Sequence, residues 1–435
     1  MNPFLFFLLI LLVMQPAQAQ LRLPGLPGLP QPLQRLPENL QQRVDERLSA
    51  TDLTGLRLSL AAQRLRRDPQ ILALDPRGEL MLRDQLLAQP SSPDARDKLL
   101  TLPGLRIIEE TRLDGLELAW LRLAVDASMG LPALLAQLRA LDPGGHYDYH
   151  HVYLASGTAA NPEQTPVAGI GSPTAAQATD ARVGLIDSGI DATHPALRDI
   201  PLRRQGCAGQ PRPALHGTAV ASLLVGRDGK FHGALPGGRL YAADVYCDAV
   251  DGGSVQAIAQ ALAWLTREQV AVINISLVGP DNALLQRAIQ AAQAKGHLIV
   301  AAVGNDGPAA PPLYPAAWPG VVSVTGVDAR HRVLAEAGRR PMLAAPGSEL
   351  AGAAARDPGY LPLRGTSFAA PLVAGLLAAR LSRPEPVRAA EALASLLREA
   401  RDLGTMGTDP IYGHGLVGER LAVAPEQLHM ARTRR

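Results

Sequence analysis

The sequence predicts an α/β fold in which a doubly wound, mostly parallel sheet follows a smaller α+β domain. From residue 181 onward, short apolar runs rich in Val and Ile alternate with helical stretches rich in Ala and Leu, as expected for parallel strands buried on both faces. Before that region, the pattern in residues 111–156 favours strand, helix and strand. A chain of 435 residues is long enough for two domains.

The N-terminus has the pattern of a signal peptide. Residues 4–14 form an apolar run that is too short to span a bilayer comfortably, and the small residues Ala17 and Ala19 fit a cleavage site. The first three residues contain no Lys or Arg, so the amino terminus supplies the only positive charge. We expect a signal peptide at 1–19 and export to the periplasm or the extracellular medium, with a buried helix as the alternative.

Residues 20–180, between the signal peptide and the main domain, fall into three segments of different composition. Residues 20–110 are a lead-in rich in Pro and Leu followed by sequence of helical composition, in which we expect a few helices. Within 111–156, residues 115–125 alternate apolar and polar positions as a strand does, and 131–141 have helical spacing with an early Pro. Residues 157–180 carry almost no charge and no period, which indicates a linker.

Residues 181–425 should form the main domain, and 426–435 a basic tail. The apolar runs predict strands at residues 182–186, 239–245, 270–275, 297–302 and 321–325. The Ala- and Leu-rich stretches predict helices at residues 254–265, 283–294 and 368–381.

Three widely separated segments carry the residue types of a nucleophilic triad. Asp187 directly follows a predicted strand, and His216 and Ser367 each open an Ala-rich helical stretch. A serine hydroxyl is a poor nucleophile at neutral pH and needs a neighbouring base and an acid that orients the base. The chain order Asp, His, Ser is one of three known to build this geometry.

The segments Asp187-Ser-Gly, His216-Gly-Thr and Gly365-Thr-Ser resemble those of the subtilisin-like serine proteases, and the resemblance extends over about residues 181 to 423. It implies peptide-bond hydrolysis through an acyl-enzyme, with Ser367 as nucleophile, His216 as general base and Asp187 as the orienting acid. It also implies that residues 111–156 are an inhibitory and chaperone prodomain, cut off near residues 154–160.

The resemblance assigns further site residues. Asn305, at the end of Ala301-Ala-Val-Gly-Asn, matches the side-chain donor of the oxyanion hole, although the family usually has a small residue where Val303 stands. Ser276, Leu277 and Gly253 match segments that pair with the substrate main chain. The family commonly has a Gly where Val278 stands, and the larger Val side chain would narrow a substrate pocket at this position.

The two cysteines, Cys207 and Cys247, both lie in the main domain. An even count in an exported protein favours a disulfide, which would close a loop of about 40 residues and stabilise the fold by ~4 kcal/mol on the chain-entropy model. Two free buried thiols are the alternative.

Composition adds little about other partners. The net charge of +2 gives no reason to expect nucleic acid, and the later apolar segments are too interrupted for a membrane span. The proposed chemistry needs no cofactor. Relatives often carry calcium, but no Asp-rich loop assigns a site, and for His194 with Asp191 turn and capping roles are favoured over a metal. The expected partners are protein or peptide substrates and the chain's own prodomain.

The sequence therefore predicts a secreted serine endopeptidase that processes itself from a proenzyme. Two alternatives stay open: a protease that cuts only its own prodomain, and a pseudoprotease that acts as a binding or chaperone protein. A lipase or esterase is disfavoured, because Gly-x-Ser-x-Gly is absent and the order of the triad is different.

Overall fold

The computed structural model describes residues 55–155, 157–159, 181–424 and 428. All of them belong to one unit of the chain, Leu48–Arg435. The predicted signal peptide, most of the linker and most of the basic tail lie outside the described residues.

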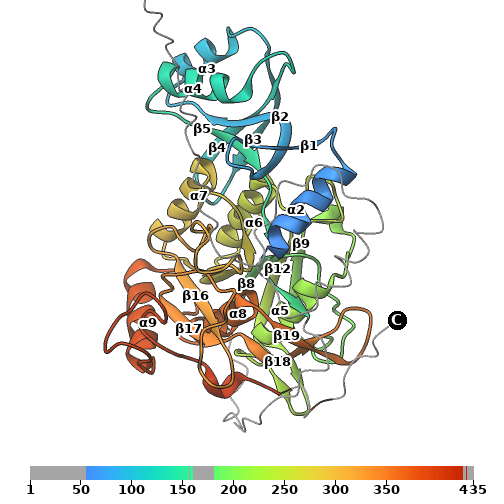
Figure 1. Cartoon of the computed structure of the whole chain (residues 1–435), viewed down its shortest axis with the longest axis vertical. Coiled ribbons are helices and arrows are strands. Elements are labelled where there is room, and N and C mark those ends of the chain that lie inside the picture. The colour runs from blue at the N-terminus through green and yellow to red at the C-terminus, as the bar shows by residue number, and fades with distance from the viewer. Residues whose placement is uncertain (1–54, 156, 160–180, 425–427, 429–435) are drawn as a thin grey trace, which may run out of the picture. The chain divides into compact units, whose positions relative to one another are not determined.

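The main domain is built on a parallel sheet, as the sequence predicts, but the sheet has seven strands and the sequence indicated five of them, missing β9 and β17. The strand order is β17-β16-β15-β13-β8-β12-β9, and every neighbouring pair is parallel. Strands β8, β12, β16 and β17 can be followed in Figure 1. The strands are β8 (Arg182–Asp187), β9 (Leu202–Gln205), β12 (Arg239–Asp244), β13 (Val272–Ile275), β15 (Leu298–Ala302), β16 (Val322–Val327) and β17 (Leu343–Pro346).

Helices cover both faces of this sheet, which makes the fold doubly wound. One face packs against α5 (Leu215–Val225), α8 (Thr366–Ala378) and α9 (Pro386–Glu399) in one apolar cluster. The other packs against α6 (Val255–Arg267) and α7 (Ala283–Ala294) in a second cluster. Helices α5 and α8 are apolar on almost all sides and are buried over nearly their whole length, as expected for helices between two layers.

Residues 72–151 form a smaller α+β domain. Its antiparallel sheet has the order β1-β2-β4-β3, with β5 also paired to β2, and α3 and α4 pack on it. Helix α2 precedes the sheet. The elements are α2 (Leu56–Arg67), β1 (Leu72–Leu74), β2 (Leu80–Gln89), α3 (Pro93–Leu100), β3 (Leu105–Leu113), β4 (Leu118–Val125), α4 (Leu131–Leu141) and β5 (His146–His151).

This domain begins earlier than the sequence pattern indicates. The helices expected ahead of residue 100 are present as α2 and α3, but β1 and β2 lie between them. The boundary expected at residue 110 falls inside β3. Leu, Met and Gln dominate β2 and favour helices intrinsically, but β2 pairs with β1, β4 and β5, and this tertiary pairing overrides the local preference.

Several short strands lie outside the two large sheets. Strand β6 (Leu154–Ala155) pairs antiparallel with β14 (Leu277–Val278), and β7 (Thr158–Ala159) pairs antiparallel with β19 (Tyr360–Arg364). The start of the expected linker is therefore a strand. The remaining elements are β10 (Arg227–Asp228), β11 (Phe231–His232), β18 (Ser348–Ala353), which pairs with β19, and the 3-10 turns η1 (Cys207–Gly209) and η2 (Glu419–Leu421).

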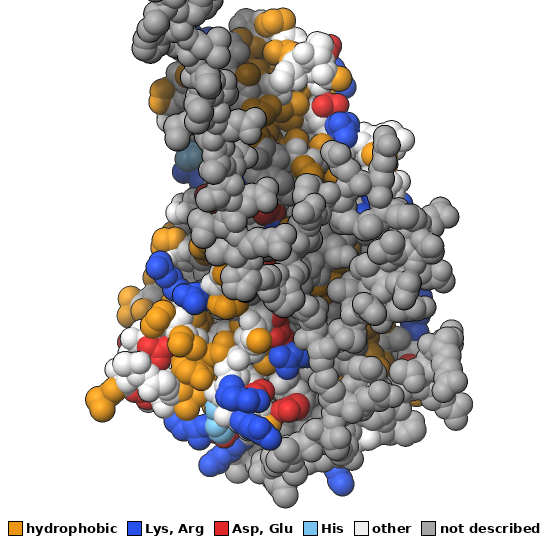
Figure 2. Space-filling view, in the orientation of Figure 1, with side chains coloured by type: hydrophobic (Ala, Val, Ile, Leu, Met, Phe, Trp, Pro, Cys, Tyr) orange, Lys and Arg blue, Asp and Glu red, His pale blue; other side chains and the backbone are white. Residues whose placement is uncertain are grey.

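Within the described parts of the chain, every helix is too short or too polar to cross a bilayer. The face drawn in Figure 2 carries basic and acidic side chains next to one another at its lower end. Charges of opposite sign at such short range partly cancel each other's field.

Candidate active site

The three predicted triad residues come from different elements and meet at one end of the central sheet. Asp187 is the last residue of β8, His216 lies in the first turn of α5, and Ser367 lies in the first turn of α8. Strand β8 stands where the strand order changes direction, because β12 and β9 extend the sheet on one side of it and β13 to β17 on the other. Open α/β sheets bind their ligands at the carboxyl ends of strands at such a point.

Hydrogen bonds join the three side chains in a line. His216 Nδ1 lies 2.8 Å from Asp187 Oδ1 and 3.0 Å from Oδ2, and His216 Nε2 lies 3.1 Å from Ser367 Oγ. The side chains of Asp187 and Ser367 are buried, and that of His216 is 12% exposed. When Nδ1–H donates to the carboxylate, Nε2 is left as an acceptor for the serine hydroxyl.

The residues around Asp187 hold its carboxylate in place. Asp187 Oδ1 accepts hydrogen bonds from the backbone N–H and the hydroxyl of Ser188, at 2.7 and 3.1 Å. The hydroxyl of Ser188 in turn accepts from the N–H of Gly217, at 3.0 Å. Gly217 permits this close approach, since a Cβ there would lie 2.1 Å from the Ser188 carbonyl oxygen. The motif glycine after the histidine therefore allows α5 to begin against the turn that follows β8.

A second carboxylate, Asp244, lies at the end of the neighbouring strand β12. Burial raises its pKa, and the nearby charge of Asp187 acts in the same direction. Asp244 Oδ1 accepts from the backbone N–H groups of Tyr246 and Cys247, at 2.9 and 3.0 Å. These bonds fix the start of the loop that runs to Ser254.

The predicted oxyanion residue lies beside the predicted nucleophile. Asn305 follows β15 and is 4% exposed, and its Oδ1 accepts a hydrogen bond from the N–H of Thr366, at 3.1 Å. This contact ties the loop after β15 to the start of α8, one residue before Ser367. The N–H groups in the first turn of a helix have no partner within the helix. Val303, the departure from the family pattern, is buried in the apolar cluster under α6 and α7.

The segments predicted to pair with substrate hold a strand of the chain itself. Leu277 and Val278 pair with Ala155 and Leu154, and the carbonyl of Gly253 accepts from the N–H of Tyr153 at 2.8 Å. The two segments predicted to bind substrate are thus occupied by residues 153–155 of the chain itself, which contact β14 on one side and Gly253 on the other. Sequence analysis did not single out Tyr246, whose hydroxyl donates to the Tyr153 carbonyl at 3.0 Å. It also gave no signal for Tyr153.

The side chain of Ser276 has a different contact. Its hydroxyl donates to the backbone carbonyl of Ser367, at 3.0 Å, and accepts from the side-chain amide of Asn274, at 2.9 Å. Ser276 therefore connects the end of β13 to the first turn of α8.

Gly157 lies directly at the nucleophile, and sequence analysis did not identify it. A Cβ at Gly157 would lie 2.2 Å from Ser367 Oγ and 2.9 Å from the ring of Phe368. Immediately after it, Thr158 and Ala159 pair with Arg364 and Leu363. Residues 154–155 and 158–159 thus pair as strands with β14 and β19, and Gly157 lies against Ser367. Pairing with strand edges is also how a peptide substrate is bound.

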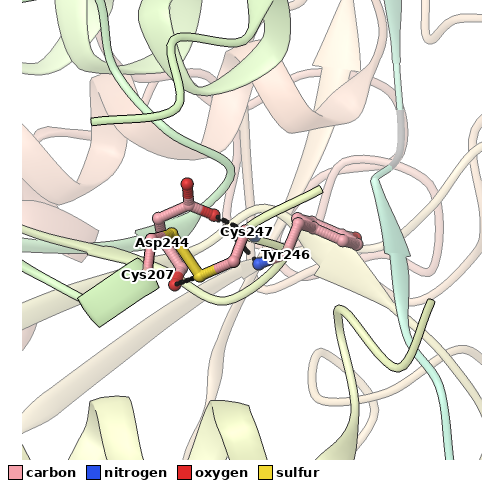
Figure 3. Close-up of a disulfide and its surroundings, with 4 residues drawn as sticks. All are labelled: Cys207, Asp244, Tyr246 and Cys247. Carbon is pink, nitrogen blue, oxygen red and sulfur yellow. Dashed lines mark hydrogen bonds between the residues drawn. A yellow bond between two sulfur atoms is a disulfide. The ribbon is translucent and has the colours of Figure 1, made fainter. Parts of the chain in front are cut away.

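Cys207 and Cys247 form a disulfide, the first of the two alternatives that the sequence left open. Figure 3 shows it beside Asp244 and Tyr246, with the hydrogen bonds between these residues. The bond joins the end of β9 to the loop after β12, with a Cα–Cα distance of 5.0 Å. It therefore fastens the loop that carries Tyr246 and Gly253.

The described residues contain one group of three possible ligands close enough to hold a metal ion, Cys207, Asp244 and Cys247, and both sulfurs are committed to the disulfide. His194 Nε2 lies 3.0 Å from the Gly359 carbonyl, and its Nδ1 accepts from the N–H of Ala196. Asp191 accepts from Thr193 within a turn. The contacts of Asp191 with Thr193 and of His194 with Ala196 are of the turn and capping kind that the sequence favoured, whereas the contact of His194 with Gly359 joins distant segments.

Comparisons with known proteins identify the family. The sequence model of the subtilase family matches residues 178–415. Subtilisin DY of Bacillus licheniformis is 32% identical over 253 residues, which are 56% of this chain and 90% of that protein. Subtilisin Savinase of Lederbergia lenta is also 32% identical over 253 residues, which are 55% of this chain and 90% of that protein.

A solved structure extends the likeness of the fold. Fervidolysin from Fervidobacterium pennivorans, described as a keratinolytic enzyme related to subtilisin, superposes with a TM-score of 0.64 at 20% identity. The superposition covers 80% of this chain and 62% of fervidolysin. The fold, the family match and the two relatives agree: the chain belongs to the subtilase family and is a subtilisin-like serine endopeptidase.

Proposed function

We propose that the chain is an exported endopeptidase that cleaves peptide bonds through Asp187, His216 and Ser367 and that first cleaves itself. The observation that carries the proposal is the hydrogen-bonded line from the buried carboxylate through the imidazole to the serine hydroxyl. Its substrates are proteins or peptides that can pair with the edge at β14 and Gly253.

The chemistry follows from this line of hydrogen bonds. Ser367 Oγ attacks the scissile carbonyl carbon while its proton passes to His216 Nε2, and Asp187 stabilises the imidazolium that forms. The tetrahedral intermediate collapses, and His216 gives the proton to the leaving amine. Water then attacks the acyl-enzyme ester, with His216 again as base, and releases the acid and the free serine. These steps use no cofactor.

Asn305 and the backbone N–H of Ser367 are the proposed oxyanion donors. Asn305 Oδ1 is held by Thr366 N–H, so the side-chain amide has a fixed orientation before substrate arrives. A donor that is fixed in advance needs no reorganisation when the negative charge develops, which makes it effective in a site shielded from water.

We further propose that maturation cuts the chain between Ala155 and Thr158, within the region that the sequence indicates. Support comes from the strand pairing of β6 and β7 on either side of Ser367 and from the position of Gly157 against Ser367 Oγ. A peptide that pairs on both sides of a nucleophile presents the bond between the two pairings to it.

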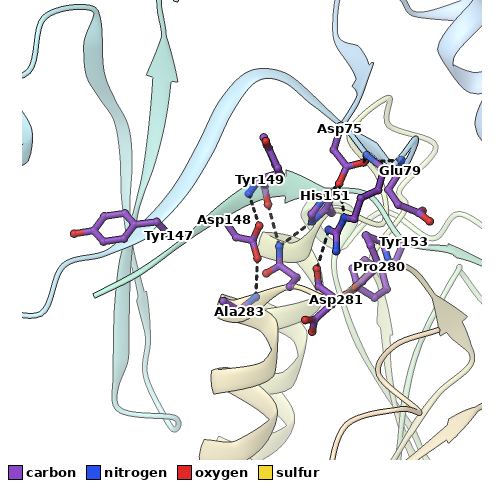
Figure 4. Close-up of polar contacts among 12 residues, drawn as sticks. Asp75, Glu79, Tyr147, Asp148, Tyr149, His151, Tyr153, Pro280, Asp281 and Ala283 are labelled. Atoms are coloured by element: carbon purple, nitrogen blue, oxygen red, sulfur yellow. Dashed lines mark hydrogen bonds and ion pairs between the residues drawn. The ribbon is translucent and has the colours of Figure 1, made fainter. Parts of the chain in front are cut away.

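The smaller α+β domain is the proposed inhibitor. Asp148 Oδ2 accepts from the N–H of Ala283 at 2.9 Å, the Asn282 side chain donates to the Tyr149 carbonyl at 3.0 Å, and the Tyr153 hydroxyl donates to the Pro280 carbonyl at 2.6 Å. Figure 4 shows Asp148 and Tyr149 of β5 beside the start of α7, with the bond from Ala283 to Asp148. Because these three contacts do not depend on the peptide bond that is cut, they support a domain that stays bound after cleavage.

Export has separate support. The predicted signal peptide directs the chain out of the cytoplasm, and a disulfide persists in an oxidising compartment. The periplasm and the extracellular medium both satisfy these two conditions.

One experiment tests the proposal against both alternatives. Wild type and Ser367→Ala are expressed in an exporting host, and intact mass and casein hydrolysis are recorded for each. We expect the wild type to lose its N-terminal region and cut casein, and the variant to stay full length and inert. A wild type that cleaves itself without cutting casein would be a self-processing protease, and a wild type as inert as the variant, even after added protease, would be a pseudoprotease.

A further inference from the structure

Helix α2 precedes the sheet of the α+β domain and is not paired into it. Arg57, Ala61 and Arg64 follow one another at spacings of four and three residues, so they share one face of the helix. Arg66 and Arg67 lie on the exposed side. We call the cleft the space between β14 and Gly253 in which residues 153–155 lie. Arg57, Ala61 and Arg64 each contact a different segment beside this cleft.

The first contact fixes the N-terminal end of α2 beside the loop that follows β15 and carries Asn305, which we call the oxyanion loop. Arg57 Nε donates to Asp306 Oδ2 at 2.7 Å, and its guanidinium also donates to Glu79 at 2.6 and 3.3 Å. The side chains of Arg57 and Asp306 are 11% and 9% exposed. Burial alone would lower the pKa of Arg57, but the bonds to Glu79 and Asp306 raise it. Asp306 is the residue after Asn305, so this ion pair links α2 to the oxyanion loop.

The second contact fixes the other end of α2 to the loop that holds the strand in the cleft. Arg64 donates to the backbone carbonyls of Val250 and Gly252, at 2.6 and 3.0 Å. Gly252 precedes Gly253, whose carbonyl accepts from Tyr153. The same loop is fastened at its base by the disulfide.

Between these two anchors, α2 packs on the strand in the cleft. Ala61 is buried in one cluster with Val152 and Leu154, and Leu60, Leu65 and Val250 pack against that cluster. Strand β6 is therefore held by β14 through backbone hydrogen bonds and by α2 through apolar contact. A peptide that leaves the cleft must break both.

We propose that the catalytic domain carries a docking site for an arginine-bearing helix, made of the Asp306 carboxylate and the carbonyls of Val250 and Gly252, and that α2 is its occupant. Docked there, α2 acts as a second inhibitory element. It keeps residues 152–155, on the N-terminal side of the cut, in the cleft next to Ser367. The inhibitory role rests on the proposed self-cleavage, because only a cut fragment can leave the cleft, whereas the docking contacts hold residues 152–155 both before and after the cut. A fragment with several attached binding elements dissociates far more slowly than one with a single element.

The decisive test measures hydrogen exchange in a background that cannot cleave. Full-length Ser367→Ala is compared with the same chain carrying Arg57→Gln and Arg64→Gln, and with a matched control carrying Arg66→Gln and Arg67→Gln, which removes two charges from the exposed face. We expect peptides that cover residues 152–155 to exchange about tenfold faster or more in the Arg57/Arg64 chain, since two charge-assisted contacts are lost. We expect the control to match its parent. Equal exchange in all three chains would overturn the proposal.

A second variant covers the case in which substitution unfolds the α+β domain. Asp306→Asn in the Ser367→Ala chain removes the charge of the carboxylate on the catalytic domain that pairs with Arg57, and it leaves Glu79 and the helix sequence unchanged. We expect faster exchange at residues 152–155, with unchanged exchange in β2, β4 and β5. If Asp306→Asn leaves residues 152–155 at the parent rate, the docking site has no role in holding them, and the proposal is wrong.

An activity measurement separates this proposal from the proposed function. In chains with Ser367 intact, the Arg57/Arg64 substitutions should leave self-cleavage complete and shorten the lag before peptide hydrolysis by about tenfold, while the Arg66/Arg67 control keeps the wild-type lag. An unchanged lag counts against the docking site. A chain that never cleaves itself would count against self-processing, while the exchange measurement still decides whether α2 holds the strand.

Discussion

The sharpest prediction about the chemistry concerns Asn305. Asn305→Asp keeps an oxygen that can accept from Thr366 N–H, so the contact that positions the loop is retained. It replaces the side-chain NH2 donor with a second oxygen. Loss of one oxyanion donor lowers kcat by about 100- to 1000-fold, or ~3–4 kcal/mol in the transition state. Because the donor acts only once charge develops, KM should change little.

The assay must not depend on self-cleavage. The N-terminal region is removed from wild type and variant by the same added protease, active sites are counted by titration, and kcat and KM are measured on a chromogenic peptide. The melting temperature of each chain controls for folding. A kcat within tenfold of wild type, or a loss confined to KM, would refute the assignment of Asn305 as an oxyanion donor.

Three further predictions concern the stability of the fold, its dependence on pH and the binding of the cleaved fragment. Removing the Cys207–Cys247 disulfide should destabilise the fold by up to ~4 kcal/mol in calorimetry, because it closes a loop of 40 residues. Burial alone would raise the pKa of Asp75, but hydrogen bonds, chiefly from His151, lower it below its usual value. The ionised Asp75 carboxylate therefore stabilises the fold above about pH 4, and this stabilisation is lost as the pH falls further. Asp75→Asn should flatten that acid loss, as followed by fluorescence between pH 2 and pH 6. Tyr153→Phe leaves the Pro280 carbonyl without its donor and should weaken binding of the cleaved fragment by ~1 kcal/mol in an inhibition assay.

Local pattern was sufficient to single out Asp187, His216 and Ser367, which the structure brings together, and to identify five of the seven strands of the central sheet. It did not predict β9 or β17. Asp187, His216 and Ser367 lie in short segments whose small residues are needed where backbones meet, as Gly217 illustrates against Ser188. Strand β13 is buried at every position, so an apolar run interrupted only by Asn274 was enough to identify it. In such places, one local pattern and the tertiary structure favour the same conformation.

Long-range contacts were not visible in the sequence. Strand β2 has a helical composition and becomes a strand because three partners pair with it. The ion pair of Arg57 and Asp306 joins residues 249 positions apart, and no local period signals it. The position of Gly157 at Ser367 likewise depends on two short strand pairings with distant segments.

The most direct test of the central claim is covalent labelling of Ser367. Wild type and Ser367→Ala, each treated with a broad protease to remove the N-terminal region, are exposed to a fluorophosphonate, and the adduct is located by peptide mass spectrometry. We predict one adduct per molecule, on Ser367, and none on the variant. An unlabelled wild type, or a label on another serine, would contradict the claim that Asp187 and His216 activate this hydroxyl.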